Sequence, residues 1–216
     1  MQKDSLLKKN DLFNLQLNLY KYHIIISIML LSSSFFVFNS IFAQSSLNSP
    51  SSSSSSMINS TQVETLYNTA NNLYDNQKYD EALQYYDKVL AIDPSSVNAL
   101  NSKGLALDHL QRYDEAVQTF DKALAIDPSS VNALNNKGLA LDHLQKYDEA
   151  VQTFDKALAI NPSSVNALNN KGLALEHLQR YDEALQFYDK ALSLDPSSIQ
   201  ALNGTSSILA ELKKEG

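Results

Sequence analysis

The strongest constraint on the fold of this chain is a repeat of 34 residues. Residues 97–130 and 131–164 are identical except at three positions, where Ser102, Arg112 and Asp127 give way to asparagine, lysine and asparagine. Prolines mark the same period at Pro94, Pro128, Pro162 and Pro196. A period of this length is typical of stacked units, none of which can bury its apolar face alone. We therefore expect function to reside on a surface that several units share.

Each unit is expected to form two helices. In the unit 97–130, apolar residues recur three or four positions apart from Leu100 to Leu110, and again from Ala116 to Leu124. This spacing places them on one side of a helix with 3.6 residues per turn. The pattern predicts two amphipathic helices that pack on each other and on the next unit.

Polar residues and proline predict where these helices begin and end. Asp114 is expected to cap the second helix, and Pro128 to end it. Either Ser129 or Ser130 is then expected to cap the first helix of the next unit.

Eight positions of the unit carry a family pattern. In the unit 97–130 they are Leu100, Gly104, Leu107, Tyr113, Ala116, Phe120, Ala123 and Pro128. They recur at Leu134, Gly138, Leu141, Tyr147, Ala150, Phe154, Ala157 and Pro162, and then at Leu168, Gly172, Leu175, Tyr181, Ala184, Tyr188, Ala191 and Pro196. The unit 63–96 has Ala70 in place of the glycine and Val89 in place of an alanine. With this combination the chain resembles the tetratricopeptide repeat (TPR) family over residues 63–216.

The resemblance implies an all-α fold, an α-solenoid of four tandem helix-turn-helix repeats with a C-terminal capping helix. We expect a signal peptide or signal anchor at 1–43 and a Ser-rich linker at 44–62. Repeats 1 to 4 and the capping helix are then expected at 63–96, 97–130, 131–164, 165–198 and 199–216. Four repeats are enough for a continuous core.

The N-terminal segment predicts export. Lysines up to Lys21 precede residues 24–42, which form a stretch of 19 residues without charge. Ala43 offers a small residue at which a signal peptidase can cut. As a helix the stretch would reach about 28 Å, close to the roughly 30 Å of a bilayer core, so retention as a membrane anchor is geometrically feasible. Both outcomes stay open, and both predict an extracytoplasmic location, secreted or anchored with the repeats outside.

The segment 44–62 is expected to be a flexible tether, because serine-rich chains bury too little apolar surface to fold. Asn59 and Asn203 fit the N-glycosylation acceptor pattern, each followed two positions later by threonine.

Charge and composition exclude several functions. From Val63 onward the chain has 22 acidic and 13 basic residues, a net charge of −9, so nucleic acid is not expected as a partner. The absence of cysteine excludes disulfides and thiolate metal sites. No glycine-rich phosphate loop or outstanding nucleophile occurs, so we expect neither catalysis nor a cofactor.

In this family one side of each first helix faces a concave groove, which implies protein or extended peptide as partner. We call the corresponding residues the first-helix stripe. In repeat 1 they are Tyr67, Asn68, Asn71 and Tyr74, and in repeat 2 Asn98, Asn101, Ser102, Leu105 and His109. In repeats 3 and 4 they are Asn132, Asn135, Asn136, Leu139, His143, Asn166, Asn169, Asn170, Leu173 and His177. Stacking aligns them into ladders of amides that donate and accept hydrogen bonds, with leucines between them.

The stripe leaves alternatives open. It carries no lysine or arginine, so the basic clamp with which some family members bind a terminal carboxylate is missing. The ladder of His109, His143 and His177 beside acidic residues would suit a metal-binding or pH-sensing module, although we expect no metal. A structural spacer or self-associating module without a specific ligand is the further alternative, and the oligomeric state is not predicted.

Overall fold

The computed structural model describes residues 52–215, with side chains from Ser60 to Lys214. The predicted export segment, Ala43 and the Asn59 side chain lie outside this part of the chain. Within it, every regular element is a helix, and the helices are α2 Ser52–Asp75, α3 Tyr79–Ile92, α4 Val97–His109, α5 Tyr113–Ile126, α6 Val131–His143, α7 Tyr147–Ile160, α8 Val165–His177, α9 Tyr181–Leu194 and α10 Ile199–Glu215. The predicted all-α solenoid is confirmed in the repeat region.

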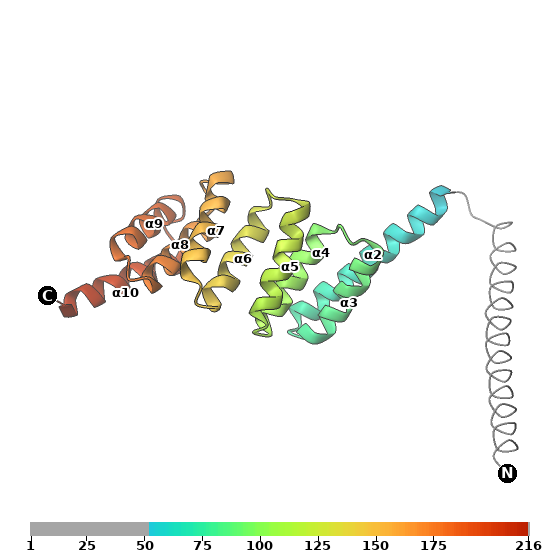
Figure 1. Ribbon diagram of the computed structural model, residues 1–216, viewed down its shortest axis with the longest axis horizontal. Coiled ribbons are helices and arrows are strands. Elements are labelled where there is room, and N and C mark those ends of the chain that lie inside the picture. The colour runs from blue at the N-terminus through green and yellow to red at the C-terminus, as the bar shows by residue number, and fades with distance from the viewer. Residues whose placement is uncertain (1–51, 216) are drawn as a thin grey trace, which may run out of the picture. The chain divides into compact units, whose positions relative to one another are not determined.

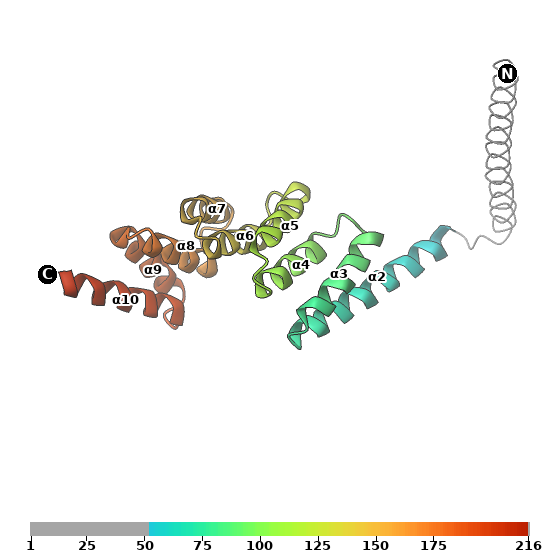
Figure 2. The ribbon, with the colours of Figure 1, turned by 60° about the horizontal axis from the view of Figure 1, so that its bottom comes forward.

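Each repeat is a helix pair, and consecutive pairs lie side by side (Figures 1 and 2). The first helices contact one another from repeat to repeat, as α4 does α6, α6 does α8 and α8 does α10. The second helix of one repeat also contacts the first helix of the next. This arrangement places the first-helix stripe of every repeat next to that of its neighbour.

An aromatic ring on the second helix fills the interface within repeats 2 to 4. Phe120 is fully buried, and a Cβ placed on Gly104 would lie only 2.4 Å from its Cε1 atom. Gly138 faces Phe154 in the same way, at 2.4 Å. In repeats 2 to 4 glycine on the first helix makes room for the ring, because a side chain there would overlap it.

The first helices begin as expected, and the second serine of each pair is the cap. Ser96 accepts a hydrogen bond from the Ala99 amide at 3.3 Å, and Ser130 accepts one from Ala133 at 3.4 Å. The first serine instead donates its backbone N–H to the preceding carboxylate, as Ser95 does to Asp93 at 3.0 Å. Both serines thus satisfy amides that would otherwise lack partners.

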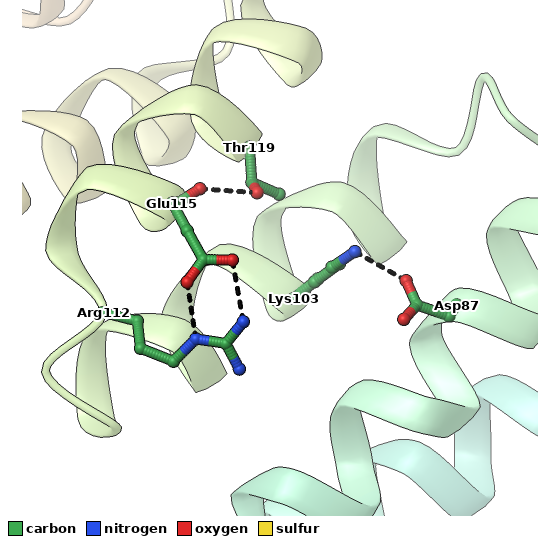
Figure 3. A network of polar contacts seen from close by, with 5 residues as sticks. All are labelled: Asp87, Lys103, Arg112, Glu115 and Thr119. Atoms are coloured by element: carbon green, nitrogen blue, oxygen red, sulfur yellow. Dashed lines mark hydrogen bonds and ion pairs between the residues drawn. The ribbon is translucent and has the colours of Figure 1, made fainter.

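The expected cap of the second helices is wrong. Helix α5 begins at Tyr113, its N-cap residue is Arg112, and no side chain caps it. Asp114 and Glu115 lie in the first turn, where negative charge interacts favourably with the helix dipole. Glu115 accepts two hydrogen bonds from Arg112, both at 2.7 Å (Figure 3), and these bonds lower the pKa of Glu115.

Helix α2 begins at Ser52, inside the segment that we expected to be a flexible tether. The expectation of coil is therefore wrong for residues 52–62. Extending an existing helix fixes one residue for each added hydrogen bond, which costs far less than starting a new helix. None of the helices in residues 52–215 is both long and apolar enough to span a membrane.

Each helix pair is joined by a glutamine with positive φ, between 57° and 61°. Gln145 follows α6, and its N–H bonds to the Asp142 carbonyl at 2.8 Å while that of Lys146 reaches the Leu141 carbonyl at 2.9 Å. These two bonds form the Schellman motif that ends many helices, in which glycine is the usual residue. A side chain in this left-handed conformation costs about 1–2 kcal/mol.

Replacing Gln145 by glycine is therefore expected to increase the free energy of unfolding by about 0.5–1 kcal/mol, since glycine adopts this conformation without strain. Urea denaturation followed by circular dichroism measures the change. Gln152→Gly, in the exposed interior of α7, is the matched control and should lower stability by about 1 kcal/mol. An equal decrease in the free energy of unfolding in the two variants would contradict the idea that Gln145 is strained by its positive φ.

Candidate functional site

The structure separates the first-helix stripe into an exposed row and a half-buried row. Asn98, Asn132 and Asn166 are exposed at the beginning of α4, α6 and α8, and we call them the open asparagine row. Asn101, Ser102, Asn135 and Asn136 are half-buried between neighbouring first helices, together with Leu105, Leu139 and Leu173. In repeats 2 to 4 the open asparagine row presents its amides to solvent, and Asn68 of α2 is exposed as well.

The half-buried amides hydrogen bond to each other across the repeats. Asn136 donates from Nδ2 to Asn101 Oδ1 at 3.1 Å, and Asn170 donates to Asn135 Oδ1 at 3.0 Å. The partners are 35 residues apart, one more than the period. Residues at equivalent positions therefore do not pair, and each amide bonds to the neighbouring position of the preceding repeat.

Different residues continue this chain of contacts at its two ends. On the N-terminal side, the Tyr67 hydroxyl and Ser102 Oγ are 3.0 Å apart. On the C-terminal side, Gln200 donates to Asn170 Oδ1 at 2.9 Å, and Asn169 donates to Ser198 Oγ at 2.8 Å. Helix α10 buries Asn169 and Asn170. These half-buried polar side chains thus help to hold adjacent repeats together.

The histidines also make contacts between repeats. The ring nitrogens Nδ1 of His143 and His177 lie 3.1 Å from Asp108 Oδ1 and Asp142 Oδ1, respectively. In repeat 1 the position equivalent to Asp108 is Tyr74, so His109 has no such carboxylate. Its ring instead stacks on Tyr79, with centroids 4.6 Å apart, and meets Tyr74 edge-on at 5.5 Å.

Each described histidine of the ladder therefore has its own neighbours in place of a shared ligand set. Between residues 52 and 215, no group of three His, Asp or Glu side chains is close enough to hold a metal ion. His143 and His177 each contact an aspartate of the preceding repeat and so connect adjacent repeats.

Several polar contacts were not predicted from the sequence. Tyr86 donates to Asn71 Oδ1 at 2.8 Å, and burial raises the pKa of Tyr86 to about 12, so that its hydroxyl remains protonated. Glu176 accepts from Tyr188 at 3.0 Å and from Ser207 at 2.7 Å. Tyrosine in place of phenylalanine at the ring position, in repeats 1 and 4 only, is the sequence signal that could have revealed both contacts.

The lysines beside the stripe turn toward the second helix of the preceding repeat. Lys103 donates to Asp87 at 2.5 Å (Figure 3), and Lys137 donates to Asp121 at 2.6 Å. Lys171 pairs with Asp155 in the same way, and its ammonium lies 3.9 Å from the centroid of the Phe187 ring. These cations are therefore engaged away from the open asparagine row.

The chain belongs to the tetratricopeptide repeat family. The family model matches residues 67–131, 127–165 and 135–199, which together span most of the repeat region. Proteins of this family are in general non-catalytic scaffolds that bind other proteins. No curated protein sequence matches the chain.

Solved structures of TPR proteins are similar to this chain. MamA (41-end) from Desulfovibrio magneticus RS-1 is 23% identical, with a TM-score of 0.60, over 70% of this chain and 92% of that one. A MamA RS-1 double mutant is also 23% identical, with a TM-score of 0.63, over 69% and 84% of the two chains. At this identity both show the fold alone. The first TPR of Spaghetti (RPAP3), bound to the HSP90 peptide SRMEEVD, is 29% identical, with a TM-score of 0.53, over 56% and 96%.

Asn136→Ala is expected to lower the free energy of unfolding by about 1 kcal/mol relative to Asn132→Ala. Both variants replace asparagine by alanine in α6, so their gains in helix propensity largely cancel, but only Asn136 bonds to the preceding repeat. Chemical denaturation measures both. If the two variants unfold at the same denaturant concentration, the amide bonds between repeats do not stabilise the array.

Proposed function

We propose that this chain is an exported, non-catalytic scaffold that binds a protein or an extended peptide along the first-helix stripe. The observation that carries the proposal is the open asparagine row, Asn98, Asn132 and Asn166, which recurs on three neighbouring helices with its side chains exposed. An asparagine amide offers two N–H donors and two acceptor lone pairs, which suits the alternating donors and acceptors of an extended backbone.

The half-buried amides can take part as well. Asn136 is half-buried and uses one N–H group in its bond to Asn101, so it keeps further bonding capacity, whereas Asn170 is buried under α10. Leu105, Leu139 and Leu173 lie beside them, half-buried, and would supply apolar contact. A ligand would therefore meet amides and apolar side chains in alternation.

The similarity to the RPAP3 domain supports a peptide as ligand but not the same peptide. That structure holds SRMEEVD, which is rich in carboxylates. The first-helix stripe here carries no lysine or arginine to pair with carboxylates, and the nearby lysines are paired with aspartates on second helices. We infer that the preferred ligand of this chain is not an acidic peptide.

Affinity capture tests the proposal. The full-length chain serves as bait in an extract of the cell envelope, beside a variant in which Asn98, Asn132 and Asn166 are all changed to alanine. A matched control changes Gln118, Gln152 and Gln186, which are exposed on second helices, to alanine. We expect the asparagine variant to lose most of the captured partner and the glutamine variant to keep it.

Two outcomes would contradict the proposal. An unchanged set of captured proteins with the asparagine variant would remove the open asparagine row as the binding surface. Capture of nothing but further copies of the chain would instead favour a self-associating module. Self-association would have a defined surface on α10. Leu202 and Leu209 are each 47% exposed there, whereas their counterparts Leu168 and Leu175 are buried.

The proposal of export rests on the N-terminal sequence, in which lysines precede the uncharged stretch 24–42. Protease added to intact cells that express the full-length chain should degrade the repeats, because they would lie outside. A variant without residues 24–42 is the control, and its repeats should be protected. Protection of the full-length chain as well would contradict export.

A further inference from the structure

We propose that a cavity in repeat 1 binds a basic peptide residue together with an adjoining bulky apolar residue. The inference rests on the proposed function, because it names the chemistry that selects a ligand at one end of the first-helix stripe. It would give the scaffold a preference for one class of peptide.

The cavity has a volume of 440 Å³ and lies between α2, the end of α3 and the beginning of α4. Its apolar walls are Val63, Tyr67, Val89 and Ile92. The volume falls within the roughly 300–1,000 Å³ typical of ligand sites. Burial of apolar peptide side chains against these walls would provide the nonspecific part of the binding energy.

The polar lining is acidic. Glu64 and Asp93 line the cavity, and none of its lining residues is a lysine, an arginine or a histidine. A carboxylate of a ligand would be repelled there, whereas a guanidinium or ammonium would pair with the two carboxylates. The stem of an arginine or lysine is apolar and can lie along Val63 and Ile92 while its charged end reaches the acids.

Tyr67 adds a second reason to expect a cation. Its hydroxyl is 3.0 Å from Ser102 Oγ, and its ring is tilted against that of Tyr86 with centroids 6.1 Å apart. These two contacts restrict the orientation of the Tyr67 side chain. An aromatic face attracts a cation within about 6 Å. The apolar walls, the carboxylates and this ring together match a basic residue flanked by an apolar one.

Three of the lining residues, Glu64, Tyr67 and Val89, belong to repeat 1 alone. The positions of Glu64 and Tyr67 are occupied by Asn98 and Asn101 in repeat 2 and by asparagine again in repeats 3 and 4. The position of Val89 is alanine in all three. Repeats with the same surface residues cannot distinguish one stretch of a ligand from the next. Selectivity for a ligand is therefore expected in repeat 1, whose surface residues differ.

The cavity is also continuous with the open asparagine row. Asn98, the first member of that row, is one of the residues that line the cavity. A peptide with its basic residue in the cavity can therefore extend its backbone over Asn98 toward Asn132. The two parts of the surface would divide the work, the cavity selecting the side chain and the row binding the backbone.

Fluorescence polarisation with three labelled nonapeptides tests the inference. The peptides share a Gly-Ser context and differ at their centre, which is Leu-Arg-Leu, Leu-Glu-Leu or Ser-Arg-Ser. We expect the full-length chain, in a mild non-ionic detergent, to bind the Leu-Arg-Leu peptide about tenfold more tightly than either of the others.

The double variant Glu64→Asn, Asp93→Asn should weaken binding of the Leu-Arg-Leu peptide about tenfold and remove the preference over Leu-Glu-Leu. The chain itself shows that asparagine is tolerated, because Asn98 is the counterpart of Glu64, and Asn161 accepts the Ser163 N–H at 3.1 Å as Asp93 accepts that of Ser95. The control Asp127→Asn, Asp195→Asn changes the net charge equally, away from the cavity, and should bind like the unmodified chain.

Equal binding of the Arg and Glu peptides, or unchanged binding by the double variant, would overturn the inference. Either result would leave the proposed function standing if the alanine substitutions in the open asparagine row still abolish capture of a partner. Conversely, selective peptide binding with unchanged capture would support the cavity and contradict the row.

Discussion

The close contact between an aromatic ring on the second helix and a glycine on the first is the interaction on which repeats 2 to 4 depend. Phe120 and Phe154 fill the space left by Gly104 and Gly138, so the two helices of a repeat are held at a short and constant separation. Because this spacing is the same in repeats 2 and 3, every other contact can recur at a fixed interval. The cross-repeat hydrogen bonds and the open asparagine row are consequences of that regularity.

Most of the fold follows from the sequence because its determinants are local and repeated. The period, the leucine spacing and the capping serines predict helices whose ends are set by neighbouring residues, as Ser130 sets the start of α6. The incorrect cap at Asp114 has a simple cause. Asp114 was the nearest capping type ahead of the apolar residues that begin at Ala116, whereas α5 already begins at Tyr113.

The candidate site was less predictable because its contacts join repeats. We expected equivalent residues to align in ladders, but Asn136 bonds to Asn101, which is 35 residues earlier. The offset of 35 rather than 34 residues depends on how one repeat is rotated and shifted relative to the next. This geometry cannot be predicted from the sequence of a single repeat. For the same reason the sequence did not reveal that His143 would meet Asp108 rather than a second histidine.

The offset of 35 residues gives the interior of the array a direction. Repeat 3 donates an amide N–H from Asn136 to repeat 2, and its Asn135 offers a carbonyl oxygen to Asn170 of repeat 4. Its two faces are therefore complementary to each other. If another copy of residues 131–164 were inserted after Ser164, it would find the Asn135 acceptor on the repeat before it and the Asn170 donor on the repeat after it. The array can thus lengthen by internal duplication. The contacts that do not repeat, those of Tyr67 with Ser102 and of Gln200 with Asn170, lie at its two ends.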